Sequence, residues 1–180
     1  MARIPDIKKE ITIPEGIKAT ILNNILTING EKGSLSREFA HPKIQIKIKD
    51  NTIALICKNP RKKQKALFGT FIAHINNMIK GTSKEFEYKM KTVFSHFPIK
   101  LSVEGKDFII QNFLGERASR KALILEGVNV DIEGDDVTVH GIDIEKVGQT
   151  VANIERATLV RNRDVRVFQD GVYRTSKGEK

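Results

Sequence analysis

Two stretches of the chain alternate apolar and polar residues with a period of two and then turn back. The first covers residues 44–57, with isoleucine at 44, 46 and 48 and a turn at Asp50-Asn51. The second covers residues 128–139 and turns at Gly134-Asp135-Asp136. This alternation is typical of strands that bury one face, and turn residues between two such runs indicate a hairpin. The sequence therefore predicts one β-hairpin in each half of the chain.

Apolar residues recur at helical spacing after each predicted hairpin. The first set is Phe68, Ile72, Ile75 and Ile79, and the second is Val147, Val151, Ile154 and the polar Thr158. Residues at this spacing share one face of a helix. We expect each helix to cover one face of its own sheet, with Ile72 and Val151 buried at equivalent points.

The two halves repeat the same order of elements. Ile44 corresponds to Val128 at an offset of 84 residues, whereas Phe68 corresponds to Val147 at an offset of 79. The first half therefore holds five extra residues, which we expect in an inserted basic loop within residues 58–65. Two such copies predict an α+β protein with two tandem duplicated domains, each an antiparallel β-sheet with a helix packed on one face.

The predicted domain boundary lies near Lys80-Gly81-Thr82-Ser83, where the helical period stops at a glycine. We expect the first domain over residues 1–82, and the second, with a basic C-terminal tail, over residues 83–180. Further strands are predicted at 19–22, 25–28, 35–39, 86–94, 99–103, 108–110 and 122–125.

The composition is that of a folded protein. Of 180 residues, 39% are hydrophobic and 29% are charged, which is enough apolar material for a core. No apolar run approaches the roughly 20 residues that a membrane-spanning helix needs. The first residues, Met1 to Lys9, lack the apolar segment of a signal peptide. We therefore expect a soluble, intracellular protein without a membrane partner.

The charge of the chain is positive and unevenly spread. There are 31 Lys and Arg against 22 Asp and Glu, a net charge of +9, with an isoelectric point near 9.7. Residues 1–84 carry 16 basic and 6 acidic residues; residues 126–155 carry eight acids and one base, and residues 156–180 seven bases and three acids. A polyanion is the first partner to consider, contacted by some surfaces and not by others. We expect the acidic stretch to face away from it.

The remaining reactive residue types favour structural roles. Cys57 is the only cysteine and shares a predicted strand face with Ile53 and Leu55, so we expect a buried thiol. The four histidines are far apart, and the acidic residues near 131–145 lack the register of a calcium loop. The sequence predicts no catalytic residues, no metal site and no cofactor.

Gly30-Glu31-Lys32-Gly33 has the G-x-x-G spacing with which KH domains clamp a nucleic-acid backbone. The KH loop joins two helices. These residues instead lie between two predicted strands, and Asn29-Gly30 is a hairpin signal. We therefore expect a turn.

Basic residues gather in three clusters: ahead of the first predicted helix, around a loop of the second half, and from the last helix into the tail. The candidate RNA-binding residues are Arg61, Lys62, Lys63, Arg117, Arg120, Lys121, Arg156, Arg161, Arg163, Arg166, Arg174 and Lys177. We expect the tail arginines Arg161, Arg163, Arg166 and Arg174 to be the main phosphate contacts, because their planar groups pair bidentately with phosphate. The segment Asp170-Gly171-Val172-Tyr173 beside them is expected to fold as a turn that fixes their direction. Aromatic residues make up 6% with no Trp, so recognition of folded RNA through its backbone and shape fits better than base stacking. No basic recognition helix for DNA is evident.

Six short motifs occur in order along the chain. They are Asn77-Met78-Ile79-Lys80-Gly81, Tyr88-Lys89-Met90, His96-Phe97-Pro98-Ile99, Asn112-Phe113-Leu114-Gly115-Glu116, Asn162-Arg163-Asp164-Val165-Arg166 and Phe168-Gln169-Asp170-Gly171-Val172-Tyr173. Together they resemble the sixth large-subunit ribosomal protein family, universal L-six, of the archaeal and eukaryotic type, and the short length favours the archaeal branch. The resemblance covers about Ile4 to Gly178. The chain departs from it at Glu31, where many members have Pro.

The resemblance implies a non-enzymatic rRNA-binding component of the large ribosomal subunit. It also implies the partners: large-subunit rRNA near the sarcin–ricin loop, neighbouring ribosomal proteins at the stalk base, and translation GTPases that dock nearby. Judged from the residues alone, a free-standing RNA-binding module or RNA chaperone is the main alternative, and an RNA-processing enzyme is the third.

Overall fold

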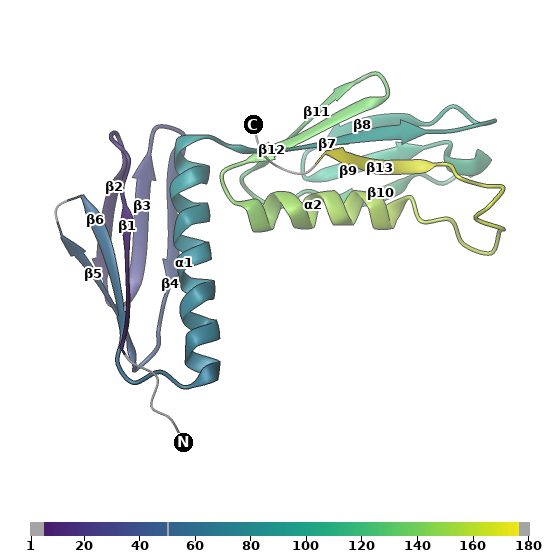
Figure 1. Cartoon of the computed structure of the whole chain (residues 1–180). Coiled ribbons are helices and arrows are strands. Elements are labelled where there is room, and N and C mark those ends of the chain that lie inside the picture. The colour runs from purple at the N-terminus through teal and green to yellow at the C-terminus, as the bar shows by residue number, and fades with distance from the viewer. Residues whose placement is uncertain (1–5, 50, 177–180) are drawn as a thin grey trace. The chain divides into compact units, whose positions relative to one another are not determined.

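The structure, a computed structural model, describes residues 6–49 and 51–176. The chain forms two compact units that divide between Lys84 and Glu85, here called unit 1 and unit 2. Each unit combines antiparallel sheets with one long helix, so the fold is α+β as predicted (Figure 1). Lys177, a candidate RNA-binding residue, lies outside the described residues.

Unit 1 contains two antiparallel sheets and the helix α1. Its elements are β1 (Ile7–Thr12), β2 (Lys18–Leu22), β3 (Ile25–Gly30), β4 (Gly33–Glu38), β5 (Ile44–Lys49), β6 (Thr52–Cys57) and α1 (Lys62–Ser83). The strand orders are β1-β6-β5 and β2-β3-β4. Side chains from β3, β6 and α1 meet in one core, which includes Leu26, Ile53 and Ile75, each with no exposed surface. Burying an Ile or Leu side chain contributes about 1.5–3 kcal/mol, so this core is the main stabilising element of the unit.

Unit 2 repeats this plan and adds a strand. Its elements are β7 (Phe86–Val93), β8 (Lys100–Glu104), β9 (Asp107–Gln111), a 3-10 turn (Phe113–Gly115), β10 (Arg120–Leu123), β11 (Val128–Glu133), β12 (Asp136–Gly141), α2 (Ile144–Ala157) and β13 (Gly171–Ser176). The strand orders are β10-β9-β8 and β11-β12-β7-β13. β13 has no counterpart in the described part of unit 1.

The strand registers confirm the duplication. Ile44 pairs with Cys57 in the β5–β6 hairpin, and Val128 pairs with Gly141 in the β11–β12 hairpin, so both partners shift by the predicted 84 residues. A third strand pairs equivalently in each of these sheets: β1 pairs with β6 as β7 pairs with β12. In unit 2, β13 then extends the sheet as a fourth strand. The sequence analysis identified β7 but missed β1, because Lys8-Lys9-Glu10 interrupts its alternation.

The two helices use equivalent faces with one difference. Phe68 and Ile75 of α1 are buried, as are their counterparts in α2, Val147 and Ile154. Val151 is buried as expected, but Ile72 is only partly buried. The reason is the neighbouring Phe71, which packs edge-on against Phe39 at 5.0 Å between ring centroids and occupies the core at this level. No helix in the described ranges is both long and apolar enough to cross a membrane.

The expected inserted basic loop is instead mostly helix. α1 begins at Lys62, with Arg61 as its N-cap, and the backbone N–H of Arg61 donates to Gln64 Oε1 at 2.8 Å. The connection from β6 to α1 is therefore only residues 58–61, and the other extra residues lengthen the helix. Glutamine three residues after the cap closes a capping box, a signal that starts the helix early.

The predicted basic tail folds back onto the sheet. The segment Asp170-Gly171-Val172-Tyr173, which we expected to be a turn, enters β13, and Gly171 pairs with Val93 of β7. Val172 is fully buried. The exposed edge of β7 supplies the backbone partners that make this short segment a strand, and no local pattern reveals such an edge.

Candidate nucleic-acid interface

Two irregular segments of unit 2 carry four of the candidate arginines. The β9–β10 loop (residues 112–119) holds Arg117, and the α2–β13 loop (residues 158–170) holds Arg161, Arg163 and Arg166. All four side chains are exposed. Arg120, at the start of β10, contacts both segments.

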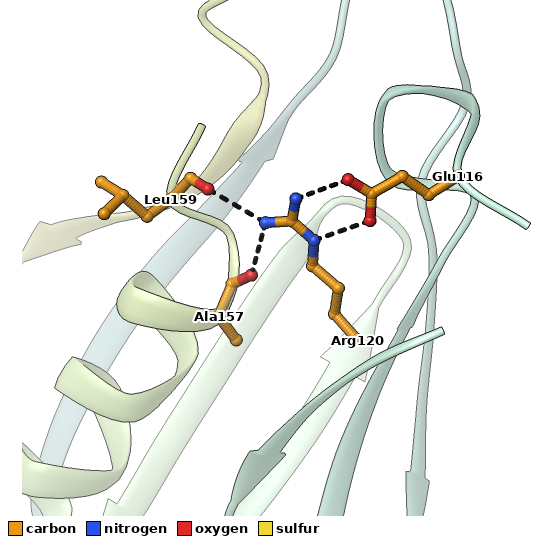
Figure 2. Close-up of polar contacts among 4 residues, drawn as sticks. All are labelled: Glu116, Arg120, Ala157 and Leu159. Carbon is orange, nitrogen blue, oxygen red and sulfur yellow. Dashed lines mark hydrogen bonds and ion pairs between the residues drawn. The ribbon is translucent and has the colours of Figure 1, made fainter. Parts of the chain in front are cut away.

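Arg120 lies between the β9–β10 loop and the end of α2 (Figure 2). Its Nε and Nη2 donate to the two carboxylate oxygens of Glu116 at 2.8 and 2.6 Å. Its Nη1 donates to the carbonyls of Ala157 and Leu159 at 2.9 and 3.0 Å. The guanidinium carbon also lies 4.2 Å from the ring centroid of Phe113. Four of the five guanidinium N–H groups are thus engaged within the protein, whereas the sequence analysis had assigned Arg120 to RNA.

Glu116 is held as a carboxylate. The hydrogen bond from Arg120 lowers the pKa of Glu116; partial burial acts against this, and the charges of Arg120 and Arg163 lower the pKa further. A charge-assisted, bidentate pair of this geometry is among the stronger polar contacts in proteins.

The motif around residues 112–116 builds the turn that presents Glu116. Asn112, Leu114 and Gly115 all adopt positive φ, at 58°, 51° and 76°. The side-chain amide of Asn112 donates to the carbonyl of Pro98 at 3.0 Å, and Leu114 is buried. A Cβ on Gly115 would lie 3.1 Å from the ring of Phe97, so glycine fits both the backbone and the space. The motif therefore has a structural role.

The α2–β13 loop is ordered by its own polar contacts. The Asp164 carbonyl accepts hydrogen bonds from the backbone N–H groups of Val167 and Phe168 at 3.1 and 3.0 Å. The Asp164 carboxylate accepts from the backbone N–H of Arg166 at 2.9 Å. The guanidinium carbon of Arg163 lies 4.9 Å over the ring of Phe168. The turn thus directs its arginines outward from a fixed backbone.

Exposed apolar side chains accompany these arginines. Leu159, Val165 and Val167 of the α2–β13 loop are 56%, 61% and 69% exposed. Sequence reasoning missed them, because isolated valines within a basic segment carry no periodic signal. A surface that combines arginines with uncovered aliphatic groups is suited to being covered by a partner.

The other candidates lie elsewhere in the structure. Arg156 is exposed in the last turn of α2, and Arg174 is on β13. Lys121 on β10 faces Asp107 at 3.6 Å. Arg61, Lys62 and Lys63 cap and begin α1 in unit 1. Arg117, Arg161, Arg163 and Arg166 thus lie on the two loops that Arg120 contacts, and Arg156 precedes Ala157 at the end of α2.

The acidic β11–β12 hairpin turns at the same end of the sheet as the α2–β13 loop. Asp136 pairs with Lys91 and Gly171 pairs with Val93, both near the end of β7. In the strand order β11-β12-β7-β13, β7 lies between this acidic hairpin and β13, which follows the basic loop. The orientation of the acidic hairpin away from RNA stays a prediction.

The structural roles predicted for Cys57, a buried thiol, and for the G-x-x-G segment, a turn, are confirmed. Cys57 is fully buried. Gly30 pairs with Gly33 in a β3–β4 turn, and a Cβ on Gly30 would lie 2.4 Å from the carbonyl oxygen of Thr82 at the end of α1. The backbone N–H of Lys32 donates to the same carbonyl at 3.2 Å. The turn is glycine-rich because it packs against the helix end.

His140 lies between two carboxylates. Its two ring nitrogens lie 2.7 Å from Glu85 Oε2 and 3.1 Å from Asp131 Oδ2. Across residues 6–49 and 51–176, no group of three or more His, Cys, Asp and Glu side chains is arranged to hold a metal ion.

Known proteins resemble this chain along nearly its whole length. A family model described as Ribosomal protein L6 matches it twice, over residues 13–85 and 97–171, one match in each unit. The large ribosomal subunit protein uL6 of Methanobrevibacter smithii is 48% identical over 171 residues, which cover 95% of this chain and 96% of that protein. Proteins of the same name from Aeropyrum pernix and Methanosarcina mazei are 44% and 42% identical, over 96% and 97% of this chain and 96% and 99% of their own lengths.

Proposed function

The chain belongs to the ribosomal protein L6 family, and from that membership we propose that it is a structural component of the large ribosomal subunit that binds large-subunit rRNA. Its role is architectural, without catalysis, and its location is the ribosome in the cytoplasm. This agrees with the family that the sequence motifs resemble.

The main observation in favour of RNA binding is the presence of four exposed arginines on the two loops that Arg120 joins. Arginine pairs with phosphate through a planar fork, and each phosphate contact releases counterions from the RNA. The backbone beneath these arginines is fixed by Asp164 and by the 112–116 turn, so little ordering entropy is lost on binding. Arg156, Arg174, Lys121 and Lys177 are proposed as peripheral contacts, and Arg61, Lys62 and Lys63 as secondary contacts from unit 1.

The proposed site of this protein on the large-subunit rRNA rests on the family resemblance. We propose that the arginine-bearing loops contact rRNA near the sarcin–ricin loop, at the region where translation GTPases dock, with ribosomal proteins of the stalk base as neighbours. A nucleotide-protection footprint of the protein on large-subunit rRNA tests this location. Protection confined to other regions of the rRNA would contradict it.

The experiment that tests the function measures binding of the full chain to large-subunit rRNA transcribed from Methanobrevibacter smithii. Small-subunit rRNA from the same organism is the control. A structural component should bind the large-subunit transcript more tightly and sediment with large subunits at high salt. A free-standing RNA-binding module or RNA chaperone should bind both transcripts alike and dissociate from subunits as salt rises.

A further inference from the structure

We infer that Glu116 and Arg120 form a positioning pair for RNA binding, which holds the β9–β10 and α2–β13 loops in one arrangement and does not itself contact RNA. The inference rests on the proposed function, because it assigns roles within that same interface.

The first observation is the occupancy of Arg120. Glu116 and two backbone carbonyls take four of its N–H donors, and its side chain is only 23% exposed. To pair bidentately with a phosphate, the guanidinium would have to break its bidentate pair with Glu116. The neighbouring Arg163 and Arg166 are free of that constraint, because their side chains are exposed and no carboxylate pairs with them in the described contacts.

The second observation is what Arg120 holds at the end of α2. The last carbonyls of a helix have no partner within the helix and commonly need a cap. Ala157 is the last residue of α2, and Leu159 is the second residue of the α2–β13 loop. By binding both carbonyls, Arg120 fixes the direction in which that loop leaves the helix.

The third observation is the carboxylate itself. Glu116 lies beside Arg117 in sequence and within the electrostatic influence of Arg163, on a surface proposed to face phosphates. A carboxylate at such a place opposes RNA binding by charge alone. Its presence is explained if it anchors Arg120, since the loop geometry then offsets the unfavourable charge.

Substitution of Glu116 distinguishes the two roles, because they predict changes in RNA affinity of opposite direction. If Glu116 only competes for Arg120, E116A removes a negative charge, releases Arg120 and tightens RNA binding. If Glu116 is a positioning residue, E116A weakens binding to large-subunit rRNA by about tenfold, because loop order is lost. E116Q, which keeps the size and one acceptor, should fall between wild type and E116A.

The matched control is Glu126, which pairs with Lys106 at 2.5 Å. The antiparallel register of β9 and β10 puts this pair at the opposite end of the sheet from the β9–β10 loop. E126A removes the same charge from a similar ion pair, so we expect unchanged or slightly tighter binding.

The salt dependence separates a positioning residue from a phosphate contact. R163A should lower the slope of log affinity against log salt by roughly 0.7–0.9. R120A should weaken affinity and leave that slope unchanged. A lowered slope for R120A, or tighter binding by E116A, would overturn the inference.

Hydrogen exchange on the free protein tests directly whether the Glu116–Arg120 pair orders the α2–β13 loop. We expect residues 158–170 to exchange faster in E116A and E116Q than in the wild type, while the core strands stay protected. Unchanged exchange there would overturn the inference even if RNA affinity fell. If wild-type protein showed no preference for large-subunit rRNA, the proposed function would fail, while the exchange data would still decide whether the pair orders the loops.

Discussion

The backbone N–H of Val172 donates a hydrogen bond of 3.2 Å to the hydroxyl oxygen of Thr158. Both residues are buried, and the bond joins the end of α2 to β13 at the base of the α2–β13 loop. Thr158→Val keeps the shape but leaves a buried N–H without its acceptor. We expect the free energy of unfolding to fall by about 1–3 kcal/mol, measured by chemical denaturation.

The control for this prediction is Thr158→Ser, which retains the hydroxyl and loses a methyl group. It should cost less than the valine variant. Equal losses for both would mean that packing, and not the hydrogen bond to Val172, accounts for the stability.

A second prediction compares two basic clusters at equal charge. Alanine at Arg161 and Arg166 should weaken binding to large-subunit rRNA more than alanine at Lys62 and Lys63. Each phosphate contact removed should also lower the salt slope by roughly 0.7–0.9. Affinity is measured across a salt series, with folding checked by circular dichroism. Equal or reversed losses would refute the assignment of the arginines as the main contacts.

The third prediction concerns acid. Because the pKa of Glu116 is lowered in the folded protein by Arg120, the pair contributes stability above the ordinary glutamate pKa of 4.5. That contribution is lost as pH falls through the lowered folded-state value. The difference in thermal midpoint between wild type and E116Q should therefore be largest near neutral pH and shrink below about pH 4.5. A difference that stayed constant down to strongly acidic pH would contradict the role of the carboxylate charge.

The fourth prediction concerns Cys57, which is buried against the core of unit 1. Cys57→Ala should lower the free energy of unfolding by about 1–2 kcal/mol, through lost packing. RNA affinity should be unchanged when measured below the unfolding transition. Loss of RNA binding at unchanged stability would show that the thiol has a functional role.

Local patterns predicted the elements whose partners lie next to them in the sequence, and also β7, whose first six residues alternate apolar and polar. The β5–β6 and β11–β12 hairpins needed only alternation and a turn, and both formed in the expected register. β1 and β13 pair with strands distant in the sequence, at β6 and β7. Their few strand-favouring residues become a strand only when an unpaired edge is present, so the sequence alone did not reveal them.

The same limit applied to the candidate interface. The charge of Arg120 was evident from the sequence, but the carbonyls of Ala157 and Leu159 that engage it lie 37 and 39 residues away. Glu116 precedes Arg120 by one helical turn's spacing, yet no helix lies there to make that spacing informative. Charge predicted which kind of partner the protein has, whereas tertiary contacts decide which arginines are free to reach it.

The position of β13 in the chain has a consequence for synthesis. All the strands of unit 1 lie before residue 62, and α1 ends at Ser83, so this unit can fold while the ribosome is still translating unit 2. The α2–β13 loop, by contrast, has only one anchored end until residues 171–176 have left the exit tunnel and paired with β7. Arg161, Arg163 and Arg166 are thus translated before the pairing of β13 with β7 fixes the backbone of their loop. A nascent chain therefore acquires its organised cationic surface only after the core of unit 1 and most of the core of unit 2 have been translated.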